Sequence, residues 1–236
     1  MQLPTRVEAN VDFLLEQFDR HNQRGTFFIL GDVAQRRPQV VRRIGESGHE
    51  IACHGHLHDR LHRLDPKRFY HDVQTCKHRL EDLTGQSVLG YRAPTFSLVR
   101  QTAWAIDVLV KLGFTYDASI FPVWHPQYGV PDAPVTPYNV QGSAGGALLL
   151  EVPPLVWATR FRNLPVAGGG YFRLLPLWLM KRGLAQAKHE QRPAILYFHP
   201  WEFDVDLPKM PLPWLGRLRT YTGLKKTHQR LNQIMS

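Results

Sequence analysis

The stretch Ile51-Ala-Cys-His-Gly-His-Leu-His-Asp-Arg60 carries three histidines in five residues, directly after a short apolar run. His54 and His58 are four residues apart, so a helical turn here would place both imidazoles on one face, where they can share a metal ion. Neutral imidazole is the commonest metal-binding side chain and suits zinc, iron, cobalt or nickel. Because the chain has 12 histidines, a polar loop with incidental histidines is the alternative, and the rest of the sequence has to decide.

The composition is that of an ordinary globular protein, with 43% hydrophobic and 21% charged residues. A chain of 236 residues is within the range of a single α/β barrel domain, and it can bury about 70% of its unfolded surface. No apolar run approaches the roughly 18 residues of a transmembrane helix, and the N-terminal residues lack the apolar core of a signal peptide. We therefore expect a soluble protein, cytoplasmic by default.

The two cysteines, Cys53 and Cys76, indicate neither a disulfide framework nor a Cys-based zinc site. Cys53 adjoins His54 and could be a ligand, although a small buried apolar role suits it better. The net charge of +9 comes from scattered basic residues that are not interleaved with aromatic ones. This pattern favours a solvated surface, attracted to anionic polymer or membrane, over a nucleic-acid site.

Short apolar runs of strand length alternate with helical patterns along the chain. We expect strands at 26–30, 50–53, 87–91, 114–116, 147–152 and 194–198. We expect helices at 7–21, 38–47, 65–83, 102–112, 174–189 and 224–234, with loops over 121–146 and around 168–173. This order predicts a mostly parallel sheet covered by helices, in a barrel or a doubly wound fold. Gly168-Gly-Gly170 does not have nucleotide-binding spacing, so a nucleotide-binding sheet is disfavoured.

Polar residues follow four of the predicted strands immediately. Each has an ordinary alternative: Arg92 could lie in a surface turn, Asp117 could cap a helix, and His199 could be a satisfied histidine at a strand end. In (β/α) barrels, however, the carboxyl ends of the strands converge on one mouth, where the chemistry occurs. We therefore predict one pocket that gathers these residues: His54, His58, Arg92, Asp117 and His199.

Several segments resemble, in order, the motifs of polysaccharide deacetylases of the NodB-like type. They are Thr26-Phe-Phe-Ile-Leu-Gly31, the segment from Gly48 to His58, Tyr91-Arg-Ala-Pro-Thr-Phe96, Tyr116-Asp-Ala-Ser-Ile-Phe-Pro122 and Tyr197-Phe-His-Pro-Trp-Glu202. Two features, Asn163-Leu-Pro-Val-Ala-Gly-Gly-Gly-Tyr-Phe-Arg173 and His199-Pro-Trp-Glu202, are similar to the subgroup found with bacterial exopolysaccharide export loci. The resemblance covers nearly the whole chain.

The resemblance implies an α/β fold, namely a distorted, incomplete (β/α) barrel in a single domain over 1–236. The core motifs span about 24–205, and 206–236 form a C-terminal extension. The implied reaction is metal-assisted hydrolysis of N-acetyl groups on a sugar polymer. His54 and His58 match the metal pair, with a divalent ion, zinc above all, as the expected cofactor.

The resemblance also implies the remaining roles. Arg92 matches the arginine that orients the catalytic base, His199 matches the catalytic acid, and Asp117 matches the acidic residue that pairs with that histidine. An imidazolium that protonates the departing amine suits this role chemically. The expected substrate-binding residues are Pro94, Tyr171 and Trp201.

One family motif has no counterpart here. The family carries Asp-Asp or Asp-x-Glu at the end of its first strand, where it supplies the base and the third metal ligand. In the family that strand precedes the region matching Val7 to His21, so it should lie before Met1, and we expect the fold to lack its N-terminal strand and to have an open sheet edge. Two histidines alone should bind zinc loosely, since catalytic zinc normally has three protein ligands. The remaining carboxylates are poor substitutes: Glu8, Asp12, Asp32 and Asp59.

Two hypotheses follow. The first is a metal-dependent deacetylase of N-acetylated exopolysaccharide, whose activity is in doubt because the base motif is absent. The second is a catalytically inactive glycan-binding or scaffold homologue in polysaccharide biosynthesis or export, with the export machinery as a partner. The second hypothesis draws on aromatic residues in the loops, which are Trp124, Tyr128, Trp157, Tyr171 and Trp201.

Overall fold

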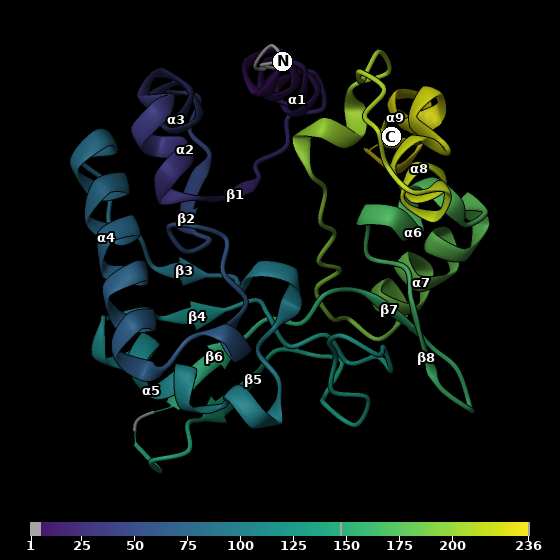
Figure 1. The fold of residues 1–236 in the computed structure, drawn as a ribbon. Helices are drawn as coiled ribbons and strands as arrows, with labels where there is room; N and C mark the ends of the chain where they lie inside the picture. The colour runs from purple at the N-terminus through teal and green to yellow at the C-terminus, as the bar shows by residue number, and fades with distance from the viewer. Residues whose placement is uncertain (1–5, 147, 236) are drawn as a thin grey trace. The chain divides into compact units, whose positions relative to one another are not determined.

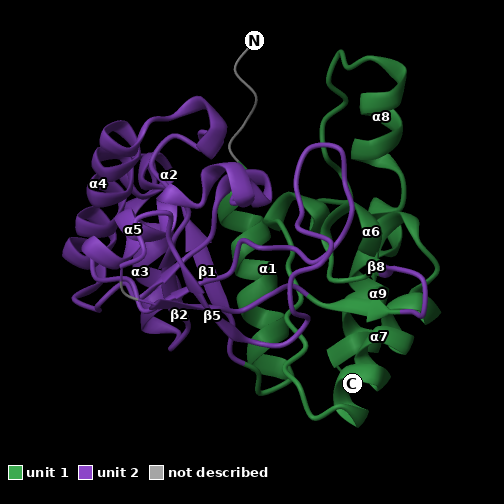
Figure 2. Ribbon diagram, turned by 90° about the horizontal axis from the view of Figure 1, so that it is seen from below, with its two compact units in different colours: residues 1–23, 155–158, 164–236 green, residues 24–154, 159–163 purple. Residues whose placement is uncertain are grey.

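The computed structural model describes residues 6–146 and 148–235. Contacts between residues divide the chain into two compact units, coloured separately in Figure 2. Unit 1 comprises 1–23, 155–158 and 164–236, and unit 2 comprises 24–154 and 159–163. The expectation of a single domain stays a prediction.

Unit 2 is built on a six-stranded sheet with the order β1-β2-β3-β4-β6-β5 (Figure 1). Its strands are β1 (Thr26–Ile29), β2 (Glu50–Cys53), β3 (Gly90–Tyr91), β4 (Tyr116–Asp117), β5 (Tyr138–Gln141) and β6 (Leu148–Glu151). All neighbouring strands are parallel except β5, which runs antiparallel to β6. Strands of a parallel sheet are covered on both faces, which is why several of them read as continuous apolar runs. The predicted α/β class with a mostly parallel, unclosed sheet is confirmed.

The described part of unit 2 contains the α-helices α2 (Gly31–Arg36), α3 (Pro38–Glu46), α4 (Pro66–Thr84) and α5 (Trp104–Lys111). The longest, α4, begins at a cap in which the Asp65 side chain accepts a hydrogen bond from the backbone N–H of Arg68. It ends at Gly85, whose φ of +67° is the left-handed conformation that glycine adopts without strain. Its buried residues recur at helical spacing and pack on β2, and they are Phe69, Val73, Cys76 and Leu80.

The predicted loop over 121–146 is wrong in one part, because it contains β5. Only Val140 of this strand is buried, so its sequence lacks the apolar alternation that predicts a strand. The strand predicted at 87–91 is shortened to β3, and α2 lies in a segment for which no helix was predicted. Of the strand predicted at 147–152, residue 147 lies outside the described residues.

Unit 1 is mainly helical. Its α-helices are α1 (Val7–Arg20), α6 (Gly169–Leu174), α7 (Leu177–His189), α8 (Trp214–Tyr221) and α9 (Thr227–Met235). The short strands β7 (Val156–Ala158) and β8 (Asn163–Pro165) form a separate two-stranded sheet. The chain also forms the 3-10 turns η1 (Leu61–Arg63), η2 (Pro94–Phe96), η3 (Arg100–Thr102), η4 (Pro200–Phe203) and η5 (Leu224–Lys226).

The strand predicted at 194–198 is not a regular strand. Tyr197 forms an isolated parallel bridge with Gly168. Its N–H donates to the carbonyl oxygen of Ala167 (3.0 Å), and its own carbonyl oxygen accepts from the N–H of Gly169 (3.1 Å). The segment is extended, but its partner bends away into α6 after one pair, so no ladder develops.

The predicted loop at 168–173 and the helix predicted at 174–189 are both corrected. The chain is helical from Gly169, as α6, and a break at Pro176 separates α6 from α7. Proline supplies no backbone N–H, and the residue before it, Leu175, is extended with ψ of 153°. The glycines therefore open a helix instead of forming a loop.

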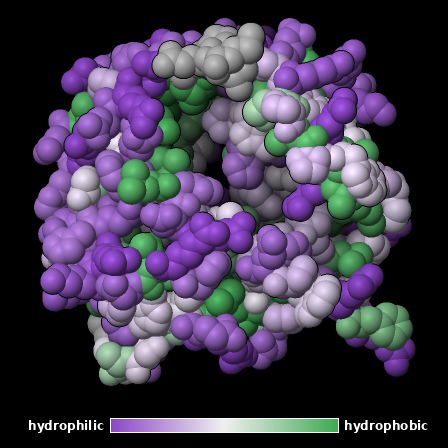
Figure 3. All heavy atoms as spheres, in the orientation of Figure 1, coloured by the Kyte–Doolittle hydropathy of each residue, from purple (hydrophilic) through white to green (hydrophobic). Residues whose placement is uncertain are grey.

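No helix in the described part of the chain is long and apolar enough to cross a membrane. The face drawn in Figure 3 is mostly hydrophilic, with hydrophobic residues gathered in small separate patches.

The bridge at Gly168 generates a stability test. Its φ is +150°, and a Cβ built there would lie 1.7 Å from the carbonyl oxygen of Tyr197. We expect Gly168→Ala to lower the free energy of unfolding by at least about 2 kcal/mol, because backbone cannot yield as a side chain can. Gly170→Ala, one helical position inside α6 with no neighbour within 4 Å of the added atom, should raise it by about 0.5–1 kcal/mol. Urea unfolding measures both, and equal stabilities would contradict the close approach.

Candidate functional site

The carboxyl ends of four neighbouring strands in unit 2 are in register. One row of paired positions crosses β2, β3, β4 and β6, and its members are Cys53, Tyr91, Asp117 and Glu151. The backbone ladder continues beyond the row: the N–H of Arg92 donates to Cys53 (3.0 Å), and the N–H of Val152 donates to Asp117 (2.8 Å). Residues that leave these strands therefore emerge at one edge of the sheet, and His54, Arg92 and Asp117 lie along it.

The two predicted metal histidines meet at this edge, but not through a helix. The imidazole centroids of His54 and His58 are 5.2 Å apart, with ring planes at 68°. The chain between them is a loop with positive φ at Gly55 (+80°) and at His58 itself (+63°). The helical turn inferred from their spacing is wrong, because the chain reverses at Gly55 in a conformation closed to a right-handed helix.

Asp72, on α4, holds this loop. Its carboxylate accepts hydrogen bonds from the backbone N–H groups of His56 (2.7 Å) and Leu57 (3.3 Å). A Cβ on Gly55 would lie 2.9 Å from the same carboxylate, so only glycine fits there without displacing it. The histidine pair is thus shaped by a residue of α4 that no local sequence pattern indicates.

The tautomer of His54 follows from its partner. Nδ1 lies 2.7 Å from the carbonyl oxygen of Arg92, which can only accept, so Nδ1 carries the proton and Nε2 carries the lone pair. Metal-binding histidines are oriented in this way, by a hydrogen bond from the other ring nitrogen to a carbonyl or carboxylate. The pair therefore fits two positions of a metal site. Across residues 6–146 and 148–235, no group of three His, Cys, Asp or Glu side chains is arranged to hold an ion.

The Arg92 guanidinium is held rigidly. Its Nε donates to the carbonyl oxygen of Ala118 (2.9 Å), and its plane lies over the ring of Phe28, 4.2 Å from the centroid. The turn that follows is strained, since Thr95 and Phe96 have φ of +56° and +53°. Strain of this kind costs about 1–3 kcal/mol per residue and clusters at functional sites.

Asp117 and Glu151 form a buried pair of carboxyl groups, each with no exposed surface. Asp117 accepts hydrogen bonds from the hydroxyl (2.6 Å) and the N–H (3.1 Å) of Ser119, and Glu151 Oε1 accepts one from the N–H of Ile120 (3.0 Å). Glu151 Oε2 is buried and receives no hydrogen bond from any N–H or O–H group of the described residues.

These two carboxyl groups share a proton. Burial raises the pKa of Glu151 well above its ordinary value, and the neighbouring Asp117 raises it further. Burial also raises the pKa of Asp117, while hydrogen bonds from Glu151 and Ser119 work against that rise. The hydrogen bond between the two carboxyl groups therefore carries a proton, and the higher pKa places that proton on Glu151.

His199 lies in unit 1, at the start of η4. Its side chain is 51% exposed, whereas Glu202 beside it is fully buried. Glu202 Oε2 accepts a hydrogen bond from the backbone N–H of His199 (2.9 Å) and lies 3.3 Å from its Nδ1. The Nε of Arg173 donates to the other oxygen of Glu202 (2.9 Å). Burial acts to raise the pKa of Glu202, but His199 and Arg173 together lower it below its ordinary value.

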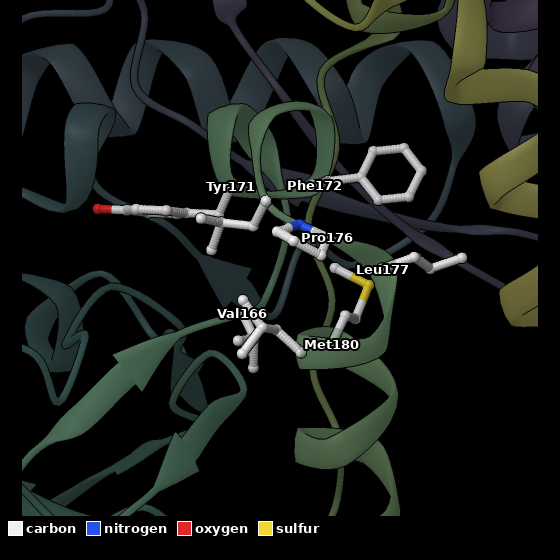
Figure 4. A pocket seen from close by; sticks show the side chains of 8 residues that line it. Val166, Tyr171, Phe172, Pro176, Leu177 and Met180 are labelled. Carbon is white, nitrogen blue, oxygen red and sulfur yellow. The ribbon is translucent and has the colours of Figure 1, made fainter.

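The three predicted substrate-binding residues differ in setting. Pro94 is buried in η2. Trp201 is partly buried between the Arg173 guanidinium, 4.8 Å from its ring, and the His199 ring, which stacks on it at 6.1 Å. Tyr171 borders a small apolar hollow beside α6 and α7, and Figure 4 shows its hydroxyl directed away from Met180.

Three polar residues around these sites carried no role in the sequence interpretation. Glu151 ends a predicted apolar strand, so the rule that selected Asp117 could have selected it as well. Glu202 lies three residues after His199, across a turn that opens with proline, and that spacing could have paired the two. Asp72 lies within a helix, and the sequence gives no signal for it.

The carboxyl pair generates a pH prediction. A carboxyl whose folded pKa is raised stabilises the fold below its unfolded pKa, and this stabilisation is lost as the pH rises through the folded pKa. Glu151→Gln replaces the shared proton by an amide N–H that does not titrate. We expect the melting temperature of the variant, relative to wild type, to increase steadily from pH 5 to pH 8.

Glu46→Gln, at an exposed carboxyl of α3, controls for the loss of a charge in the same unit. Parallel melting curves for wild type and Glu151→Gln across this range would refute the shared proton.

Known families match both parts of the chain. Residues 4–116 match the polysaccharide deacetylase family, and residues 118–236 match a domain of unknown function, DUF3473. A peptidoglycan deacetylase-like protein of Gibberella zeae is 35% identical over 114 residues, which are 48% of this chain and 33% of that protein. The match therefore spans about a third of the length of that relative.

Two solved structures are similar in fold. One is described as a polysaccharide deacetylase of Mycobacterium smegmatis, with a TM-score of 0.63, 25% identity, and coverage of 82% of this chain and 64% of that one. The other is Puue allantoinase, with a TM-score of 0.56, 22% identity, and coverage of 80% and 59%. These neighbours have a (β/α)-barrel-like fold, as the sequence predicted.

The pairing of the two matched regions is typical of deacetylases of exopolysaccharide loci. Together the matches extend from residue 4 to residue 236, interrupted only at Asp117. The chain therefore belongs to the family defined by DUF3473, whose model matches half of it, and this region follows one that matches the polysaccharide deacetylase family.

Proposed function

We propose that this protein removes N-acetyl groups from an exopolysaccharide by metal-assisted hydrolysis, with zinc as the ion. The observation that carries the proposal is the histidine pair at the strand ends, with Nδ1 of His54 bonded to the carbonyl oxygen of Arg92. The family is generally dependent on a divalent metal. Imidazole ligands with a fixed tautomer suit zinc.

In this proposal His54 and His58 would hold a divalent ion, which would supply Lewis-acid activation of the amide carbonyl and of water. Arg92, fixed by Ala118 and held over the ring of Phe28, matches the arginine that orients the catalytic base, the residue for which this sequence has no counterpart. His199, half-exposed on η4, donates a proton to the departing amine, which would otherwise leave as an unstable anion.

The resemblance gives His199 the partner Asp117, and this pairing stays a prediction. Substrate contacts are proposed for Trp201, whose ring lies beside the acid, and for Tyr171 and Pro94. An N-acetylated polymer is the proposed substrate, and the export machinery of such a polymer is the proposed partner.

The alternative is a glycan-binding or scaffold protein without turnover. It is favoured by one observation, the lack of a third metal ligand beside the histidine pair among the described residues. Catalytic zinc normally has three protein ligands. The two functions differ in whether sugar binding survives removal of the metal.

Metal binding tests the histidine pair directly. We expect His54→Ala and His58→Ala each to weaken Zn²⁺ binding, measured by calorimetry, by more than about 100-fold, since losing even an outer partner of a ligand typically costs 10–100-fold. His78→Ala, at an exposed histidine of α4 in the same unit, should bind as wild type does. Equal Zn²⁺ affinities in wild type and the three variants would refute the proposed metal site.

Acetate release tests the reaction. Wild-type protein with Zn²⁺ should release acetate from an N-acetylglucosamine polymer, and a chelator should stop the release. Polymer binding that survives the chelator, without acetate release at any metal concentration, would instead establish the glycan-binding function.

A further inference from the structure

We propose that Glu202 is the carboxylate that positions His199, and that the C-terminal extension holds Glu202 in place through Arg173. The proposal rests on the proposed role of His199 as the proton donor. Glu202, in the His199-Pro-Trp-Glu202 motif, would orient the His199 ring. The segment 219–223, which lies within the DUF3473 region, would hold Arg173.

The first support is that both carboxylate oxygens of Glu202 accept hydrogen bonds. Oε1 accepts from the Nε of Arg173 (2.9 Å). Oε2 accepts from the backbone N–H of His199 (2.9 Å) and faces its Nδ1 at 3.3 Å. A carboxylate with no exposed surface is costly unless it is paired and hydrogen-bonded. Here its partners are the imidazole and a guanidinium.

The second support is the way in which Arg173 is held. Its Nη1 lies within hydrogen-bonding distance of three carbonyl oxygens of the C-terminal extension, which share its two N–H groups: those of Arg219 (2.9 Å), Thr220 (3.1 Å) and Thr222 (3.1 Å). Only 3% of its side chain is exposed. The guanidinium is therefore fixed on one side by backbone and on the other by Glu202.

Gly223 allows the extension to come this close. Its φ is +81°, and a Cβ there would lie 2.4 Å from the carbonyl oxygen of Arg173. The extension thus wraps a single buried arginine, whose charge is directed at Glu202. Because Trp201 lies under the same guanidinium, the motif after His199 packs on Arg173 through two of its residues.

The consequence for His199 concerns which ring nitrogen is available. A carboxylate can only accept a hydrogen bond, so Glu202 keeps a proton on Nδ1. Nε2 is then the nitrogen left to exchange its proton, on a side chain that is half-exposed. In a general acid, the orienting partner and the reacting nitrogen must be opposite each other on the imidazole, and this geometry provides that arrangement.

Glu202 also caps the turn, since it accepts from the backbone N–H of His199. A purely structural cap would stabilise η4 without selecting the proton-bearing nitrogen. The two roles are separated by observing the ring itself, which needs neither metal nor substrate.

The experiment is ¹⁵N NMR of histidine-labelled full chain, with the His199 signals assigned by their loss in His199→Gln. At a pH where the ring is neutral, we expect the proton on Nδ1 in wild type. In Glu202→Gln the charged Arg173 still selects the amide oxygen, so the amide nitrogen replaces Oε2, gives up the bond from the backbone N–H of His199 and donates to Nδ1. The proton should therefore move to Nε2.

Two matched variants control this result. Asp117→Asn removes the charge of the carboxyl that the family resemblance would pair with His199, and it should leave the proton on Nδ1. Arg192→Lys alters another buried arginine of unit 1, paired with Glu190, and should also leave the tautomer unchanged. A proton that stays on Nδ1 in Glu202→Gln, or moves in Asp117→Asn, overturns the proposal.

Arg173→Lys provides a second route if Glu202→Gln does not fold. Lysine keeps the charge but cannot donate to Glu202 and to three carbonyl groups at once. We expect a mixture of the two tautomers, and an unchanged Nδ1 proton would exclude the role of the extension. If the tautomers change as expected but no acetate is released, only the deacetylase proposal is refuted. If acetate is released but the tautomer is unaltered in Glu202→Gln, only the positioning role of Glu202 is refuted.

Discussion

The polar edge of unit 2 depends on the hydrogen-bonding register of its parallel strands. β2, β3, β4 and β6 each stop at the same level, and the amide that follows each strand still bonds to its neighbour. Side chains of consecutive strands therefore project from a common line, although they are far apart in sequence. A slip of one residue in any of these pairings would turn every side chain of that strand to the opposite face. The histidine pair, Arg92 and the buried carboxyl groups all depend on this single constraint.

Buried carboxyl groups in the two units differ in their protonation state. Arg92 acts to lower the pKa values of Asp117 and Glu151, but burial outweighs it and drives one of them to keep its proton. Glu202 is buried as deeply, but His199 and Arg173 stabilise its charged form. Environment, and not residue type, thus decides that one carboxyl group donates a hydrogen bond and the other only accepts.

The sequence predicted the elements whose signal is local. β2 has the predicted bounds because a short apolar run precedes the histidines, and α4 has a proline start and a glycine stop. β5 was not predictable, since it is a strand only through its pairing with β6 and buries a single side chain. The His54–His58 contact was predicted for the wrong reason, because Gly55 and the distant Asp72 shape the loop. Glu202 was within a quoted motif, but its role depends on Arg173 and on carbonyl groups of the C-terminal extension, which no spacing reveals.

The single parallel bridge between Gly168 and Tyr197 has a consequence for how these motifs are inherited. It fixes the start of α6, and Arg173 follows one helical turn later, while His199 and Glu202 follow directly on the other side of the bridge. The bridge therefore joins the glycine-rich stretch and the His199-Pro-Trp-Glu202 stretch into one structural unit. The close approach at the glycines and the pairing of Arg173 with Glu202 each need both stretches. A homologue that loses the glycines should therefore lose the glutamate as well. Because of this bridge, the two stretches should co-vary among homologues.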